Sequence, residues 1–80
     1  MAANEKEVRI RRFLKERFKH YKDEIGSEES LEGIVDSLGL FDLVSFLEEE
    51  FSLSIPNEEF SPQRFSTIDG ILQVVEEFES

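Results

Sequence analysis

Apolar residues recur at helical spacing in three separate stretches of this 80-residue chain, and this pattern restricts the fold more than any other feature. Residues three or four positions apart lie on one face of a helix, so each stretch predicts a helix with one buried stripe. The stripes are Ile10, Phe13, Leu14, Phe18 and Tyr21; Leu40, Leu43, Val44, Leu47 and Phe51; and Ile68, Ile71, Leu72, Val75 and Phe78. We therefore expect an all-α fold, a small antiparallel helical bundle in a single domain that covers residues 1–80.

Capping residues and helix breakers set the expected bounds of the first two helices. Asn4 followed by Glu7 is a capping-box-like start, which predicts a first helix from about Glu5 to Lys22. The second helix is expected from about Ser37 to Phe51, because Pro56 bars a helix through the residue that precedes it. Within this helix, Leu47 and Phe51 fall in the frame that we expect to be buried.

Shorter elements are expected around these helices. Residues 23–36 predict a long loop that is anchored in the core by Leu31, Ile34 and Val35. Residues 57–60 predict one helical turn, and Ser61 with Pro62 at the first helical position predicts a short helix that ends near Phe65. A capping pattern at Ser66 and Asp69 predicts the last helix, from about Thr67 to Phe78, which tolerates Gly70 at some cost. The sequence therefore predicts three longer helices and one or two short helical turns. If the short helix from Ser61 is counted, the prediction is a four-helix bundle.

The composition excludes several classes of protein. The chain has no cysteine, which rules out disulfides, thiolate metal sites and thiol catalysis. No apolar run approaches the roughly 18 residues that a membrane span needs, and the N-terminus is polar. We therefore expect no membrane span. A reducing cytosol is compatible with the lack of cysteine, and we expect a cytoplasmic protein that is a monomer.

Charge is distributed unevenly along the chain. Residues 1–22 hold eight bases and three acids, a net charge of +5, whereas residues 23–80 hold Arg64 and sixteen acids, a net charge of −15. Such an acidic surface repels nucleic acid and attracts basic protein partners. The basic face of the first helix has two interpretations that stay open: a solvated face, or a surface for anionic lipid or for the acidic half of another molecule.

The residues of known catalytic and metal sites do not occur in the required patterns. His20 is the only histidine and no Gly-x-Ser-x-Gly turn is present, so we expect no serine hydrolase and no enzyme of another kind. The acids do not follow the spacing of a calcium-binding loop, and no glycine-rich loop cradles a phosphate, so we expect no metal site.

Ser37 stands where the second helix is expected to begin, between Asp36 and Leu38. Unpaired N–H groups and the positive end of the helix dipole favour an attached phosphate at such a position. Asp36 or Ser37 can serve as the N-cap. On these three residues alone, an ordinary capping serine is the better explanation of Ser37.

The segments that follow Ser37 make the pattern more specific. Asp36-Ser37-Leu38 is followed by Leu43-Val44, by Leu47-Glu48-Glu49-Glu50-Phe51 and by Ile55-Pro56. In this arrangement the chain resembles an acyl carrier protein, in register from about Leu31 to Phe78. The resemblance implies that Ser37 carries a 4′-phosphopantetheine arm, derived from coenzyme A, whose thiol holds an acyl or aminoacyl group as a thioester.

The resemblance also implies partners. These are a phosphopantetheinyl transferase and the enzymes that load or accept the acyl or aminoacyl group through basic docking patches. Three consecutive acids at the end of a helix, without a compensating lysine, break a local stability rule and thereby favour a role in docking. The candidate partner-binding residues are Asp36, Leu38, Phe41, Asp42, Glu48 and Glu49. The alternative is a small acidic helical interaction module without a prosthetic group.

The chain departs from many fatty-acid carriers at three places. Ile34-Val35 replaces Gly-Ala, Gly39-Leu40 replaces Asp-Thr, and the Phe60–Phe65 connector is about two residues longer. These features look more like carriers of specialised pathways, including D-alanyl carriers and those of polyketide or nonribosomal peptide assembly. We therefore predict a specialised cargo rather than the ordinary growing fatty acyl chain.

Overall fold

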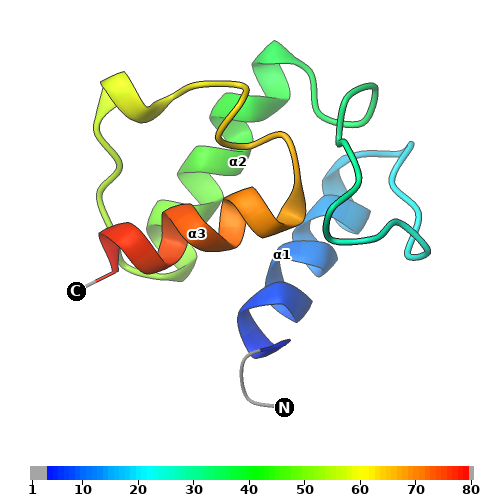
Figure 1. Cartoon of the computed structure of the whole chain (residues 1–80), viewed down its shortest axis with the longest axis horizontal. Coiled ribbons are helices and arrows are strands. Elements are labelled where there is room, and N and C mark those ends of the chain that lie inside the picture. Colours follow the sequence, from blue (N-terminus) through cyan, green and yellow to red (C-terminus); the bar gives the residue numbers. More distant parts are fainter. Residues whose placement is uncertain (1–3, 80) are drawn as a thin grey trace.

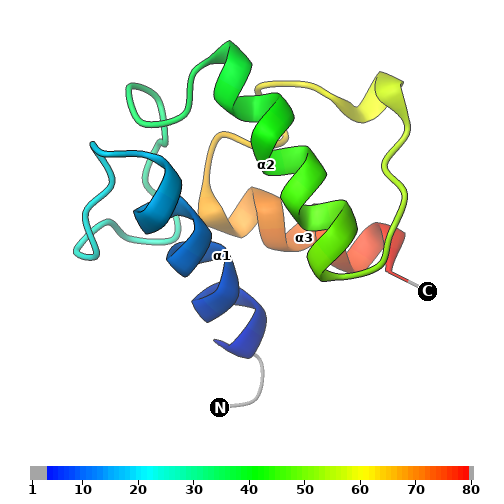
Figure 2. The ribbon, with the colours of Figure 1, turned by 180° about the vertical axis from the view of Figure 1, so that it is seen from behind.

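A computed structural model describes residues 4–79 of the chain. Its helices are α1 (Asn4–Arg17), α2 (Ser37–Glu50) and α3 (Ile68–Phe78), with one short 3₁₀ turn, η1 (Asn57–Glu59), between α2 and α3. No strand occurs among the described residues. α1 and α2 run in opposite directions and α3 lies across them (Figure 1), as the view from behind also shows (Figure 2). The prediction of an all-α helical bundle is confirmed.

All three helices contribute to one core. Side chains that are almost completely buried come from every helix and from the loop before α2: Ile10, Leu14, Leu31, Leu43, Val44, Leu47, Ile68, Ile71, Val74 and Val75. Leu47 is therefore a core residue, as predicted. Phe51 is only half-buried, and its ring packs edge-on against Phe46 with 6.4 Å between the ring centroids.

α1 is shorter than predicted, because it ends at Arg17 rather than Lys22. The Phe18 N–H still donates to the Leu14 carbonyl at 2.9 Å, and the Tyr21 N–H then donates to the Phe18 carbonyl at 3.0 Å. This turn brings Tyr21 back into the core, and its hydroxyl lies 3.1 Å from the Arg11 guanidinium. Burial of Tyr21 outweighs the helical propensity of residues 18–22.

The short helix expected from Ser61 to Phe65 is not formed. The segment is a turn in which the Ser61 hydroxyl accepts from the Gln63 N–H at 3.2 Å and the Ser61 carbonyl accepts from the Arg64 N–H at 3.0 Å. Phe65 turns inward and is buried. The expected four-helix arrangement is therefore corrected to three α-helices and the single turn η1 within residues 4–79.

α3 begins one residue later than the predicted cap implied. Its N-cap is Thr67, whose hydroxyl accepts from the Gly70 N–H at 3.0 Å, whereas the Ser66 hydroxyl donates to the Gln63 carbonyl. Gly70 has a packing reason to be glycine, since a Cβ built there would lie 2.5 Å from the Arg64 carbonyl oxygen. The turn before α3 thus rests directly on the helix.

The long loop between α1 and α2 is tied to the start of α3. The Leu31 N–H donates to the Ser66 carbonyl at 2.7 Å, and the Asp69 N–H donates to the Ser27 carbonyl at 2.9 Å. Leu31 is buried, and Ile34 and Val35 pack against the core, so the predicted anchors of this loop are confirmed. These hydrogen bonds hold together the two segments that flank the start of α2.

None of the helices within residues 4–79 combines the length and the apolar character that crossing a membrane requires.

Candidate functional site

Ser37 is the first residue of α2. Asp36 is the N-cap, because its carboxylate Oδ1 accepts from the Gly39 N–H at 2.7 Å and its carbonyl accepts from the Leu40 N–H at 2.9 Å. Of the two predicted capping residues, Asp36 therefore fills this role, and the Ser37 side chain is left exposed to solvent. Helix geometry gives the N–H groups of Ser37 and Leu38 no intrahelical acceptor. The site thus combines an accessible hydroxyl with unpaired donors that suit a phosphate group.

The first turn of α2 packs against Phe18, which follows the end of α1. A Cβ built on Gly39 would lie 2.5 Å from Cε1 of the Phe18 ring, so the ring occupies the space that a side chain would need. Phe18 also packs edge-on against Phe13, with ring centroids 6.0 Å apart. Ser37 therefore projects from a packed helix end.

A cavity of about 620 Å³ opens beside Ser37. It lies between the loop that precedes α2, the first turns of α2 and the segment that joins η1 to α3. Its main apolar lining consists of Leu31, Val35, Leu40, Phe41, Phe60 and Phe65. Polar lining includes Glu32, Asp36, Ser37 and Gln63. The predicted attachment residue is thus part of the cavity wall.

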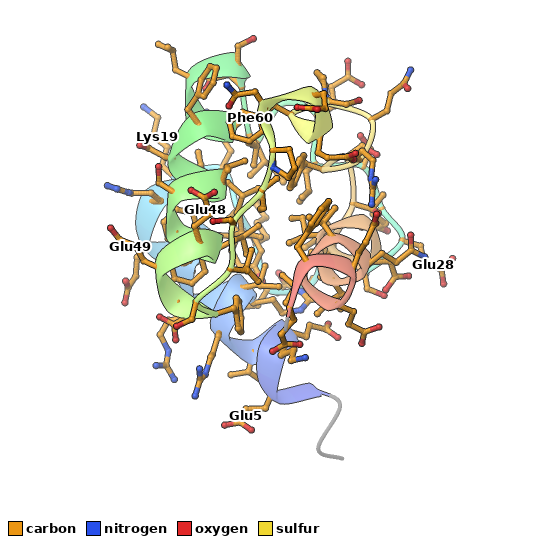
Figure 3. All side chains as sticks on the ribbon, turned by 90° about the vertical axis from the view of Figure 1, so that its left-hand side faces the viewer. Glu5, Lys19, Glu28, Glu48, Glu49 and Phe60 are labelled. Atoms are coloured by element: carbon orange, nitrogen blue, oxygen red, sulfur yellow. The ribbon has the colours of Figure 1, made fainter. Side chains whose placement is uncertain are left out.

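Two phenylalanines meet across this cavity. Phe41 of α2 and Phe60 after η1 have ring centroids 5.9 Å apart, with the ring planes tilted by 58°. Figure 3 shows Phe60 beside η1, on the side of that turn that faces α2. Leu38 and Phe41 remain 79% and 57% exposed. Both residues are accessible next to Ser37, as the partner-binding prediction requires.

Arg64 fastens the segment that carries Phe60 and Phe65. Its guanidinium donates to the Glu59 carboxylate at 2.6 Å and to the Glu77 carboxylate of α3 at 2.5 Å. The hydrogen bond to Glu77 is the largest cause that raises the pKa of Arg64, and Glu59 adds to it. Sequence reasoning missed this role, although Arg64 is the only base after Lys22 and that isolation is a usable signal.

One exposed stripe of α2 leads away from Ser37. Leu38, Asp42, Ser45 and Glu49 are all exposed, and their spacing of four, three and four residues places them on one helix face. Seven residues separate Asp42 from Glu49, which corresponds to about 10 Å along the helix axis. The structure therefore gathers Asp36, Leu38, Phe41 and Asp42 around Ser37, while Glu48 and Glu49 lie at the far end of α2.

Glu48 and Glu49 have different surroundings. The Glu48 carboxylate is half-buried and accepts from the Ile55 N–H at 2.8 Å, which ties the connector to the end of α2. Glu49 is exposed and points away from the body of the protein (Figure 3). Glu50 pairs with Arg9 of α1 at 3.2 Å. Two of the three consecutive acids therefore have structural partners, so their occurrence alone does not demand a docking role.

Part of the basic face of α1 is paired with acids of the same protein. Lys6 pairs with Glu79, Arg11 with Glu7, and Lys15 with Asp23. His20 is exposed. No group of three or more acidic or histidine side chains within the described part of the chain is arranged to hold a metal ion.

Comparison with known proteins agrees with this geometry. No family model matches the chain. A probable acyl carrier protein, PigG, of Serratia sp. is 42% identical over 43 residues, which are 54% of this chain and 49% of that protein. The D-alanyl carrier protein of Streptococcus pyogenes is 38% identical over 47 residues, 59% of this chain and 60% of that protein.

Over these segments the chain is similar to carrier proteins. The resemblance inferred from the residues after Ser37 is thereby confirmed. The match spans about half the length of the Serratia protein and three fifths of the streptococcal one. Both names describe a carrier rather than an enzyme, which agrees with the lack of a catalytic constellation in the sequence.

Proposed function

We propose that this chain is a carrier protein that bears 4′-phosphopantetheine on Ser37 and delivers an acyl or aminoacyl group to partner enzymes. When bound, the arm supplies a thiol that holds this group as a thioester. The observation that carries the proposal is an exposed serine at the first position of α2, on the wall of a cavity of about 620 Å³. The related carrier proteins support the same conclusion.

The residues around Ser37 fit such a group. Attachment forms a bond from the Ser37 hydroxyl oxygen to the phosphorus of the arm and breaks the pyrophosphate bond of coenzyme A. Adenosine 3′,5′-bisphosphate leaves, and the hydroxyl proton passes to a base of the transferase or to water. The unpaired N–H groups at the start of α2 and the positive end of the helix dipole would stabilise the phosphodiester of the attached arm. Asp36 caps the Gly39 N–H and so keeps this helix end formed.

Docking is assigned to the exposed face of α2. Leu38 and Phe41 offer apolar contacts beside Ser37, while Asp42 and Glu49 offer charges to the basic patches of a transferase and of loading or accepting enzymes. Asp36 and Glu48 belong to the same set, but each also holds a backbone N–H of its own chain. We assign the chain to the cytoplasm, where such enzymes have access to coenzyme A.

The mass of the intact protein tests the proposal. Incubation with coenzyme A and a broad-specificity phosphopantetheinyl transferase should add one phosphopantetheine, and Ser37→Ala should abolish this addition. Ser45→Ala is the matched control, since Ser45 is an exposed serine on the same helix and should leave the addition unchanged. Modification that persists in Ser37→Ala would refute the assignment. No modification of the parent would favour an acidic interaction module without a prosthetic group.

A further inference from the structure

The chemistry of the cavity beside Ser37 is not that of a plain hydrocarbon pocket. Its volume of about 620 Å³ falls within the range of roughly 300–1,000 Å³ in which proteins hold small molecules. Three phenylalanines line it: Phe41, Phe60 and Phe65. Phe65 is buried and Phe60 half-buried, so the aromatic wall continues from the exposed rim into the interior.

The charged groups of the lining all have the same sign. Glu32 and Asp36, both exposed, are the acidic residues of the lining, and none of the described residues that line the cavity is a lysine, an arginine or a histidine. Arg64 is the nearest base along the chain, but its guanidinium is engaged by Glu59 and Glu77. The cavity therefore lies in a negative electrostatic environment.

Aromatic rings and carboxylates together are the groups that attract an organic cation. The face of an aromatic ring attracts an ammonium group. A carboxylate near the same position adds a favourable charge interaction, whereas it repels a cargo that ends in a second carboxylate. An aminoacyl thioester carries one free ammonium group and no free carboxylate, so it matches this lining.

We propose that the cavity receives the cargo itself, and that this cargo is a positively charged aminoacyl group. The inference rests on the proposed attachment of the arm to Ser37. Glu32 provides the counter-charge, while Phe60 and Phe65 provide the aromatic wall. Asp36 has a smaller share, because its carboxylate already caps the Gly39 N–H.

Three loaded forms of the intact protein test this inference. The transferase is supplied with β-alanyl-, butyryl- or succinyl-coenzyme A, so that nearly isosteric groups end in an ammonium, a methyl or a carboxylate. At about pH 6.5 the amine is charged. The β-alanyl form should melt roughly 2–8 °C above the butyryl form, because only a cargo bound to the folded state stabilises it. Backbone amide resonances of residues 31–36 and 60–66 should shift in the β-alanyl form.

Substitutions in the cavity lining test which side chains cause the difference in melting temperature between the loaded forms. Glu32→Gln and Phe60→Leu should each reduce the difference in melting temperature between the β-alanyl and butyryl forms by at least half. Glu76→Gln is the matched control, because Glu76 is an exposed acid of α3 that does not line the cavity, and it should retain the difference. Equal melting temperatures for the three forms, or the highest value for the succinyl form, would overturn the inference. Failure of the transferase to modify Ser37 with any of the three would instead refute the proposed function.

Discussion

Gly39 lies under the Phe18 ring, and this contact gives the departure at Gly39-Leu40 a physical explanation. A side chain at residue 39 would have to displace a ring that also packs against Phe13. The glycine is therefore required by packing at the end of α1, independently of any partner. Packing also explains Gly70 in α3, because the Arg64 carbonyl oxygen occupies the space that a side chain at residue 70 would need.

Gly70→Ala should destabilise the protein. Alanine is the better helix former by about 1 kcal/mol, but its Cβ would lie 2.5 Å from a backbone oxygen, and overpacking of this kind costs about 1–3 kcal/mol. We expect a net loss of about 1 kcal/mol in the free energy of unfolding, measured by urea denaturation. Gln73→Ala, at an exposed position of the same helix, should change stability little. A gain in stability for Gly70→Ala would show that the Arg64 turn does not rest on α3.

α2 combines two functions along its length. Its first turn carries Ser37 and follows the Asp36 cap, while another side of the helix buries Leu43, Val44 and Leu47 in the core that α1 and α3 share. The exposed stripe of Leu38, Asp42, Ser45 and Glu49 makes no contribution to this core. Substitutions on the two sides of α2 therefore have separable effects on stability and on partner docking.

Leu47→Ala should be the more damaging of two substitutions at the end of α2. Leu47 has no exposed surface, and removal of a fully buried leucine side chain costs about 2–5 kcal/mol. Thermal unfolding followed by circular dichroism should show a large fall in melting temperature. Phe51→Ala should cost less, since Phe51 is half-buried. A melting temperature equal to that of the parent would place Leu47 outside the core.

In the molecule as a whole, positive charge is concentrated in residues 1–22 and negative charge in residues 23–80. Four bases of α1, namely Lys6, Arg9, Arg11 and Lys15, pair with acids of the same protein, whereas Asp42 and Glu49 take part in no ion pair among residues 4–79. The stretch from residue 23 to 63 has no lysine or arginine. The exposed carboxylates of Asp42 and Glu49 are therefore available to a basic partner.

Charge reversal should slow the modification of Ser37. Asp42→Lys and Glu49→Lys should lower the second-order rate constant of the transferase, mainly through slower association, and the parent rate should fall as salt is added. Glu48 is unsuitable for this test, because its reversal would also break the hydrogen bond to Ile55. Glu76→Lys makes the same change in net charge on α3 and should have the smaller effect. A rate that is independent of salt would argue against electrostatic docking.

The helices and the candidate site could be inferred from the sequence because their signals are local. Apolar spacing depends on neighbours three or four residues away, and the capping of α2 involves Asp36 and Gly39, three residues apart. The same is true of Ser37, whose place at the start of a helix follows from its immediate neighbours. The spacing of apolar residues and the local capping pattern were therefore sufficient to predict the helices and the position of Ser37.

Long-range contacts settled the rest. α1 stops early because Tyr21 is buried, and the segment from Ser61 to Phe65 forms a turn because Phe65 enters the core while Arg64 binds Glu59 and Glu77. The cavity needs Glu32, Ser37 and Phe60 to meet from three different segments. The stability of each of these three features depends on contacts between residues that lie up to dozens of positions apart in the sequence. No local pattern encodes such contacts, so these features are decided only by the tertiary structure.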